Sequence, residues 1–191
     1  MARKTKEEFK RKRKPSVFIV CEGRNKTERT YFNHFNERYA PYNLRIVNCE
    51  STDITSMAQK ANSIFVENDL DLEQHKYEKY IKAKSKYKKI IMIPSNPCFE
   101  VWLQYYFVKD PKAVTSSQKA KDEMRKRLAG YTESMDVIAE AKLGINEHVL
   151  AIQNSEVKNS HYEEILTEVQ KNPYTEVATI VTELSAYKKQ D

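Results

Sequence analysis

The sequence predicts an α/β fold in which a mostly parallel sheet is flanked by helices. Four short runs of β-branched and other apolar residues alternate, in the first half of the chain, with segments whose apolar spacing is helical. Such alternation is typical of parallel strands joined by helices. Carboxylates follow several of these runs, and open α/β sheets bind their ligands beyond the carboxyl ends of the strands.

The first predicted strand is residues 17–21, which ends on Glu22 before the turn residue Gly23. A helix follows, because Asn25 and Glu28 have the spacing of a helix N-cap and the acid three residues later. Apolar side chains spaced three and four apart then form one stripe of that helix: Tyr31, Phe32 and Phe35.

Three more strands and two helices complete the predicted core. The strands are residues 44–47, 63–66 and 90–93, and the helices are residues 54–62 and the lysine-rich segment 74–89. After the last strand, Asn96 suits an N-cap and Pro97 suits the first position of another helix. The aromatic residues that follow, among them Phe99 and Trp102, are expected in the core.

The chain divides by composition into three parts. Residues 1–14 form a basic arm, residues 15–107 contain the predicted sheet, and residues 108–191 have mostly helical apolar spacing. We expect the third part to pack on the second as a helical C-terminal part.

The net charge of +6 is concentrated in the arm. Residues 1–14 carry eight Lys and Arg against two Glu, which accounts for the whole excess. A basic arm attracts polyphosphate, although a solvated tail has the same composition. A second basic segment, residues 79–89, includes Tyr80 and Tyr87, as in surfaces that hold a nucleic-acid strand. The candidate nucleic-acid-binding residues are Lys10, Arg11, Lys12, Arg13, Lys14, Lys84, Lys86, Lys88 and Lys89.

Several protein classes are excluded by what the sequence lacks. It has no apolar run long enough to span a membrane and no secretory signal, so a cytoplasmic location is expected. Its three cysteines lack CxxC spacing, which argues against a zinc site. It also lacks a phosphate-binding glycine loop, so any nucleoside triphosphate is expected to bind another protein.

Carboxylates from three strand ends are expected to converge at one edge of the sheet. They are Glu22, the pair Asp69 and Asp71, and Glu100. Close carboxylates repel one another unless a cation lies between them, and Mg²⁺ or Mn²⁺ prefers such oxygen ligands. Each residue also has a structural alternative, because acids are common at turns and at helix N-termini. The same holds for Glu28 as a capping acid, and His75 is either a proton-transfer group or simply exposed.

Three motifs resemble the RloB family of bacterial proteins, which are found near restriction and abortive-infection loci. The motifs are VFIVCEGRNKTE from Val17, Asp69-Leu70-Asp71 with His75 behind it, and SNPCFEVW from Ser95. The resemblance implies a Toprim-like, that is Rossmann-like, sheet. It implies metal ligands at Glu22, Asp69 and Asp71, catalytic roles for Glu22, Glu28 and Glu100, and a site border at Thr27, His75 and Asn96.

The resemblance also implies a function. RloB-like proteins are commonly partnered with an ABC-type ATPase in phage defence, with the Toprim-like subunit as effector nuclease. We therefore expect an Mg²⁺-dependent nuclease that hydrolyses DNA or RNA, with tRNA among the candidate targets. The alternative is a non-catalytic nucleic-acid-binding or adaptor subunit that recruits the ATPase. Whether the chain forms a homodimer stays open.

Overall fold

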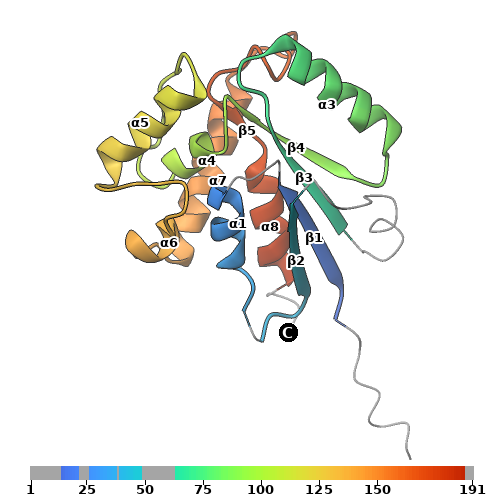
Figure 1. Ribbon diagram of the computed structural model, residues 1–191, viewed down its shortest axis with the longest axis vertical. Helices are drawn as coiled ribbons and strands as arrows, with labels where there is room; N and C mark the ends of the chain where they lie inside the picture. Colours follow the sequence, from blue (N-terminus) through green and yellow to red (C-terminus); the bar gives the residue numbers. More distant parts are fainter. Residues whose placement is uncertain (1–13, 22–25, 38, 49–62, 188–191) are drawn as a thin grey trace, which may run out of the picture.

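A computed structural model describes residues 14–21, 26–37, 39–48 and 63–187. Within them the chain forms a five-stranded sheet with helices on both faces (Figure 1). The strand order is β2-β1-β3-β4-β5, and β5 alone runs antiparallel to its neighbour. The strands are β1 (Ser16–Cys21), β2 (Asn43–Asn48), β3 (Ser63–Asp69), β4 (Ile91–Asn96) and β5 (Tyr174–Thr175). The predicted α/β class with a mostly parallel sheet is confirmed.

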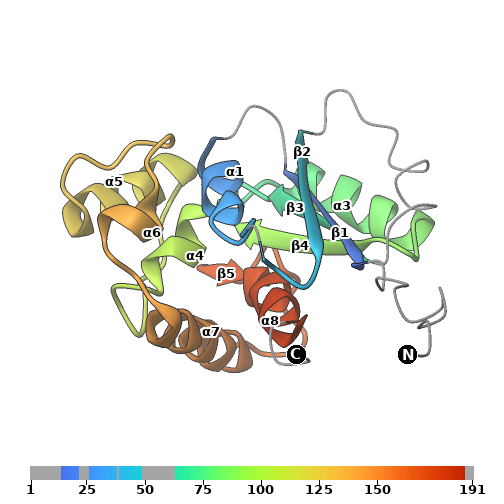
Figure 2. The same ribbon diagram turned by 90° about the horizontal axis from the view of Figure 1, so that it is seen from below.

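Helices cover the two faces of the sheet unequally. Helix α3 packs on one face, whereas α1, α4 and α8 contribute to the larger core on the other face. Figure 2 shows α5, α6 and α7 gathered beside the sheet, so the C-terminal part is helical as predicted. The described helices are α1 (Lys26–Asn33), α3 (Gln74–Lys86), α4 (Glu100–Gln104), α5 (Ser117–Arg127), α6 (Val137–Glu140), α7 (Ile145–Ser160) and α8 (Val177–Tyr187). None of them combines the length and apolar character that crossing a bilayer requires.

Strands β1, β3 and β4 each contain an apolar run because both faces of these strands are covered by helices. Successive side chains of a strand point to opposite faces. In β1, Ile19 and Cys21 face the larger core, while Phe18 and Val20 face α3. In β3, Phe65 faces the larger core. This alternation fixes which side chains each strand offers to α1.

Aromatic side chains hold α1 against the larger face. Tyr31 of α1 contacts Phe99 and Trp102, with ring centroids 5.4 and 6.3 Å apart, respectively. Phe99 and Trp102 have no exposed surface, as expected of core residues. The ring packing holds α1 against α4 and the segment before it.

Three details of the helices and of the C-terminal part differ from the sequence prediction. Helix α4 begins at Glu100 and not at Pro97, because Asn96 is the last residue of β4 and its side chain bonds elsewhere. The C-terminal part contributes the edge strand β5, which is too short to leave a sequence pattern. Helix α3 ends at Lys86, before a turn in which the Ile90 N–H donates to the Tyr87 carbonyl. The helix predicted over residues 54–62 lies outside the described residues.

The alternation in the sheet predicts an unequal response to truncation. Replacing Phe65, which is 1% exposed, by Ala should lower the free energy of unfolding by about 3–5 kcal/mol, because it removes a ring from the larger core. Urea denaturation measures the change. The matched control is Ile91→Ala in β4, which is 43% exposed and should cost about 1 kcal/mol or less. Equal losses would contradict the assigned faces.

Candidate metal centre

Three carboxylates meet at the carboxyl end of β3. Glu67 and Asp69 come from that strand, and Glu28 comes from the first turn of α1. One oxygen from each lies within 4.8 Å of the other two. Among the described residues this group could hold a metal ion.

The pleat of β3 brings two of these residues together. Phe65, Glu67 and Asp69 are spaced two apart and therefore face the same side of the sheet. Phe65 belongs to the core that includes α1, so the two acids continue that row toward the strand end. The ladder with β4 extends to the pair Asp69 and Ser95, which keeps the row regular.

The helical period of α1 supplies the third carboxylate. Glu28 precedes Tyr31, Phe32 and Phe35 by three, four and seven positions, so it lies on the same buried stripe. Its exposure is 0%, as is that of Glu67, while Asp69 is half-buried. The apolar packing of α1 therefore also carries Glu28 to the end of β3.

The pKa of the Cys21 thiol reflects the negative charge of the nearby carboxylates. Cys21 is the last residue of β1, on the face of the sheet that Glu67 shares. Burial raises its pKa well above the ordinary value, and the nearby carboxylates Glu67, Glu28 and Asp69 raise it further. Arg29 acts in the opposite direction. The thiol is therefore held protonated beside a concentration of negative charge.

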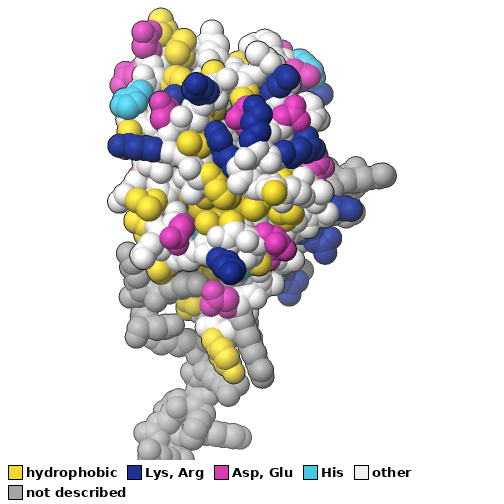
Figure 3. Space-filling view, turned by 90° about the vertical axis from the view of Figure 1, so that its left-hand side faces the viewer, with side chains coloured by type: hydrophobic (Ala, Val, Ile, Leu, Met, Phe, Trp, Pro, Cys, Tyr) yellow, Lys and Arg dark blue, Asp and Glu magenta, His cyan; other side chains and the backbone are white. Residues whose placement is uncertain are grey.

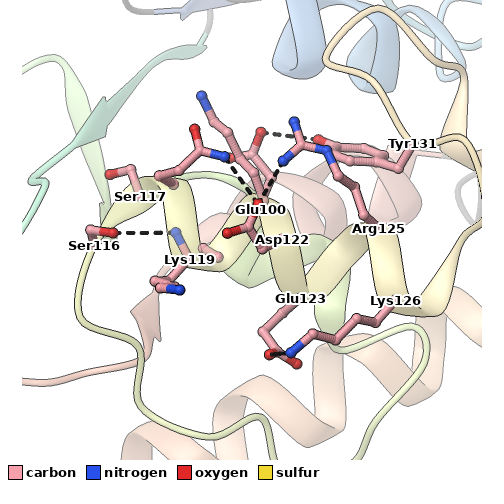
Figure 4. Close-up of polar contacts among 12 residues, drawn as sticks. Glu100, Ser116, Ser117, Lys119, Asp122, Glu123, Arg125, Lys126 and Tyr131 are labelled. Carbon is pink, nitrogen blue, oxygen red and sulfur yellow. Dashed lines mark hydrogen bonds and ion pairs between the residues drawn. The ribbon is translucent and has the colours of Figure 1, made fainter.

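Glu100 lies beside this group in a hydrogen-bonded network of its own. It is 3% exposed, and Oε1 accepts a hydrogen bond from the Tyr131 hydroxyl at 3.0 Å (Figure 4). Thr27 Oγ1 lies 3.5 Å from the same oxygen. Thr27 is nearer to the backbone carbonyl of Glu133, at 3.1 Å. Burial, then Glu100 and Asp69, raise the pKa of Cys98, so both carboxylates act on one thiol. Glu100 thus borders the three-carboxylate group.

Asp71 and His75 occupy different surroundings. Asp71 has left the strand, with φ at 50°, and its two oxygens accept from Lys76 and Ser117. It is outside the group of three. His75 has a 63% exposed side chain that contacts Glu73 at 3.2 Å. The role of Asp71 as a ligand and that of His75 at the site border stay predictions.

Asn96 has a structural task on the side of the sheet that faces α3. Its side chain is fully buried, and Nδ2 lies 2.9 Å from the carbonyl of Val169 and 2.7 Å from that of Lys171. Its Oδ1 accepts from the Leu72 N–H at 2.9 Å. Asn96 thus joins the turn after β3 to the segment that precedes β5.

The basic residues predicted to hold nucleic acid are spread over several places. Lys14 donates to the Ala40 carbonyl at 2.5 Å, before β1 begins. Lys84 donates to the Tyr80 hydroxyl at 2.9 Å and lies 3.8 Å from Glu168. Lys86 lies over the ring of Tyr87, and Lys88 and Lys89 are exposed. Glu22 and the residues Lys10, Arg11, Lys12 and Arg13 lie outside the described residues.

Sequence reasoning missed Glu67, although a signal was present. The predicted strand stopped at Val66 because Glu67 and Asn68 interrupt the apolar run. The spacing of Phe65, Glu67 and Asp69 nevertheless continues the strand period, and β3 extends to Asp69. An acid in phase with a buried strand face was the feature that could have identified it.

The fold and the site define an α/β protein with clustered carboxylates at the carboxyl edge of a parallel sheet. The sequence matches the RloB-like protein family over residues 17–184, which is most of the chain. The chain therefore belongs to the RloB-like family. No curated protein and no solved structure matches it.

The contacts of Asn96 predict a loss of stability when they are removed. Asn96→Ala should lower the free energy of unfolding by roughly 2–4 kcal/mol, because buried carbonyls lose their donor. Chemical denaturation measures the loss. The control is Asn43→Ala, an exposed residue with one long contact of 3.5 Å to the Lys14 carbonyl, which should change little. A loss no greater than that of the control would show that these bonds do not hold the segment.

Proposed function

We propose that this protein is a metal-dependent nuclease that hydrolyses phosphodiesters of DNA or RNA, with Mg²⁺ or Mn²⁺ as its ion. The observation that carries the proposal is the convergence of Glu28, Glu67 and Asp69 within 4.8 Å at the carboxyl edge of the sheet. This edge is where open α/β sheets bind their ligands.

The donor set fits a hard divalent cation. All three groups are carboxylates, and Mg²⁺ prefers oxygen ligands at about 2.0–2.1 Å. Ligand oxygens of one such ion are roughly 3–4 Å apart, so small side-chain rotations bring the three within range. A thiol is a poor ligand for such an ion, and Cys21 is held protonated beside the group.

Each residue then has a task in the proposed site. Glu28, Glu67 and Asp69 would hold the ion, which when bound supplies an activated water and neutralises charge on the phosphodiester. Glu100 is the candidate proton acceptor, because the Tyr131 hydroxyl fixes its carboxylate 3.5 Å from Thr27, the residue before Glu28. Glu22 directly follows β1 in sequence and stays a candidate ligand or acid/base residue.

The wider role follows from the family and remains part of the proposal. Membership in the RloB-like family supports a Toprim-like site and action as the effector of an antiphage, abortive-infection system. A separate ABC-type ATPase would be its partner, since the sequence has no phosphate-binding glycine loop of its own.

The proposal predicts that cleavage depends on the carboxylates of β3. Glu67→Gln and Asp69→Asn should each lower the rate of Mg²⁺-dependent cleavage by about 100-fold or more, because each removes a charged metal ligand. Gel assays on labelled RNA and DNA measure the rate. The matched control is Glu73→Gln, whose side chain is 47% exposed and contacts His75. Cleavage that persists in both variants would refute the proposal.

Metal binding gives a second test that needs no substrate. At an ion concentration 100 times the Kd, Mn²⁺ should stabilise the wild-type protein by about 2.7 kcal/mol, or a rise in Tm of roughly 5–10 °C. Glu28→Gln should reduce this rise, because Glu28 belongs to the group. Calorimetry with and without EDTA measures it. If Mn²⁺ leaves the Tm unchanged, the protein is better explained as a nucleic-acid-binding or adaptor subunit.

A further inference from the structure

A polar pocket lies against the first turn of α1, outside the three-carboxylate group. It has a volume of about 280 Å³ and is lined by Lys26, Arg125, Thr132, Glu133 and Ser134. Lys26 is the first residue of α1, Arg125 comes from the last turn of α5, and the other three come from the loop between α5 and α6. Segments far apart in sequence therefore form its wall.

The first turn of α1 is shared by this pocket and the candidate metal centre. Lys26 and Glu28 are two residues apart and so point to different sides of the helix. Glu28 faces the end of β3, whereas Lys26 faces the pocket. Thr27 lies between them, and its hydroxyl donates to the backbone carbonyl of Glu133, a residue of the pocket, at 3.1 Å. The two sites are therefore adjacent and connected.

The charges of the pocket favour an anion. The carboxylate of Glu133 is neutralised by an ion pair with Lys121. Arg125 contacts Asp122 at 2.7 Å through one nitrogen, Nη1, and a guanidinium carries further donors (Figure 4). Lys26 adds a further cation, so three positive groups stand against two carboxylates. The N-terminus of α1 adds partial positive charge.

Lys and Arg side chains are also numerous on the side of the molecule that carries α5. Figure 3 shows the side of the molecule that carries α5, with Lys and Arg concentrated in its upper half and carboxylates among them. Helix α5 itself carries five Lys and Arg residues: Lys119, Lys121, Arg125, Lys126 and Arg127. A negatively charged strand could thus approach the pocket over a basic surface.

We propose that this pocket binds a backbone phosphate of the nucleic acid, next to the phosphodiester held at the candidate metal centre. The inference rests on the proposed nuclease function and names the part of the site that holds the substrate. Arg, Lys and hydroxyl groups are the side chains that bind phosphate oxygens, and such contacts fix the position of a strand. The hydroxyls of Thr132 and Ser134 lie 3.3 Å apart on the same wall.

The arrangement explains how an acidic site accepts an anionic substrate. The carboxylates alone repel a phosphate, and a bound ion offsets this only locally. The cationic pocket, on the other side of the first turn of α1, holds the neighbouring part of the nucleic-acid strand. Lys26 and Arg125 would therefore bind the strand and hold it in position next to the candidate metal centre.

Binding of a fluorescently labelled single-stranded oligonucleotide to the full chain in EDTA tests the proposal. Lys26→Gln and Arg125→Gln should each weaken binding by roughly five- to tenfold, as expected for one partly exposed charged contact. Each should also lower the slope of log K against log salt by about 0.7–1, which counts the lost phosphate contact. Lys26→Arg and Arg125→Lys keep the charge and should restore most of the binding.

The matched control is Lys158→Gln in α7, a residue that pairs with Asp110 and belongs neither to the pocket nor to α5. It should change the affinity less than twofold. Equal weakening by all three Gln variants, unchanged binding in all three, or no binding by the wild type would overturn the proposal. A further outcome would also overturn it. If inorganic phosphate raises the Tm of the wild type but not that of Lys26→Gln, while the two proteins bind the oligonucleotide equally well, the pocket binds free phosphate and not the strand.

Binding in EDTA separates this inference from the proposed activity. A protein that binds through Lys26 and Arg125 but cleaves nothing with Mg²⁺ supports the pocket and refutes the nuclease. The opposite result is cleavage that depends on Glu67 together with oligonucleotide binding that is unchanged when Lys26 and Arg125 are replaced. It supports the nuclease and refutes the pocket.

Discussion

The docking of α1 on the larger face of the sheet is the contact on which the candidate site depends. Two carboxylates, Glu67 and Asp69, belong to β3, whereas Glu28 belongs to α1. The three meet only because the buried stripe of α1 lies over the row of side chains that begins with Phe65. The same packing that excludes water from the core thus assembles the oxygens, and no separate device is needed to bring them together.

The helical C-terminal part contributes to this docking. The hydroxyl of Tyr31 in α1 lies 2.6 Å from that of Tyr106, which lies 2.7 Å from His148 Nδ1 in α7. Burial raises the pKa of Tyr31, so its hydroxyl stays protonated within this chain of hydrogen bonds. Thr27 is bound to the loop before α6 through Glu133. Helix α1 is therefore held from the sheet side and from the C-terminal part.

The sequence allowed the four parallel strands to be predicted because burial on both faces leaves continuous apolar runs. Strand β5 has two residues, and its pairing depends on Ser95 and Asn96, far away in the chain, so no local pattern identifies it. The predicted start of α4, at Pro97, was wrong for a related reason. Asn96 has the residue type of an N-cap, but its amide bonds with Leu72 and the segment near Val169, which only the tertiary structure brings near.

The sequence predicted a cluster of carboxylates at the carboxyl edge of the sheet, but only some of the residues that form it. Asp69 and Asp71 have the spacing of neighbours on one strand face, yet the chain turns at Asp71 and Leu72, which have φ of 50° and 62°. The turn is fixed from outside, since the Asp71 N–H donates to the Pro97 carbonyl at 2.8 Å. The pair that keeps the strand period is Glu67 and Asp69. Burying an acid inside a strand costs free energy, whereas acids are common at turns. An acid in phase with the core is therefore stronger evidence for a site than an acid at a turn.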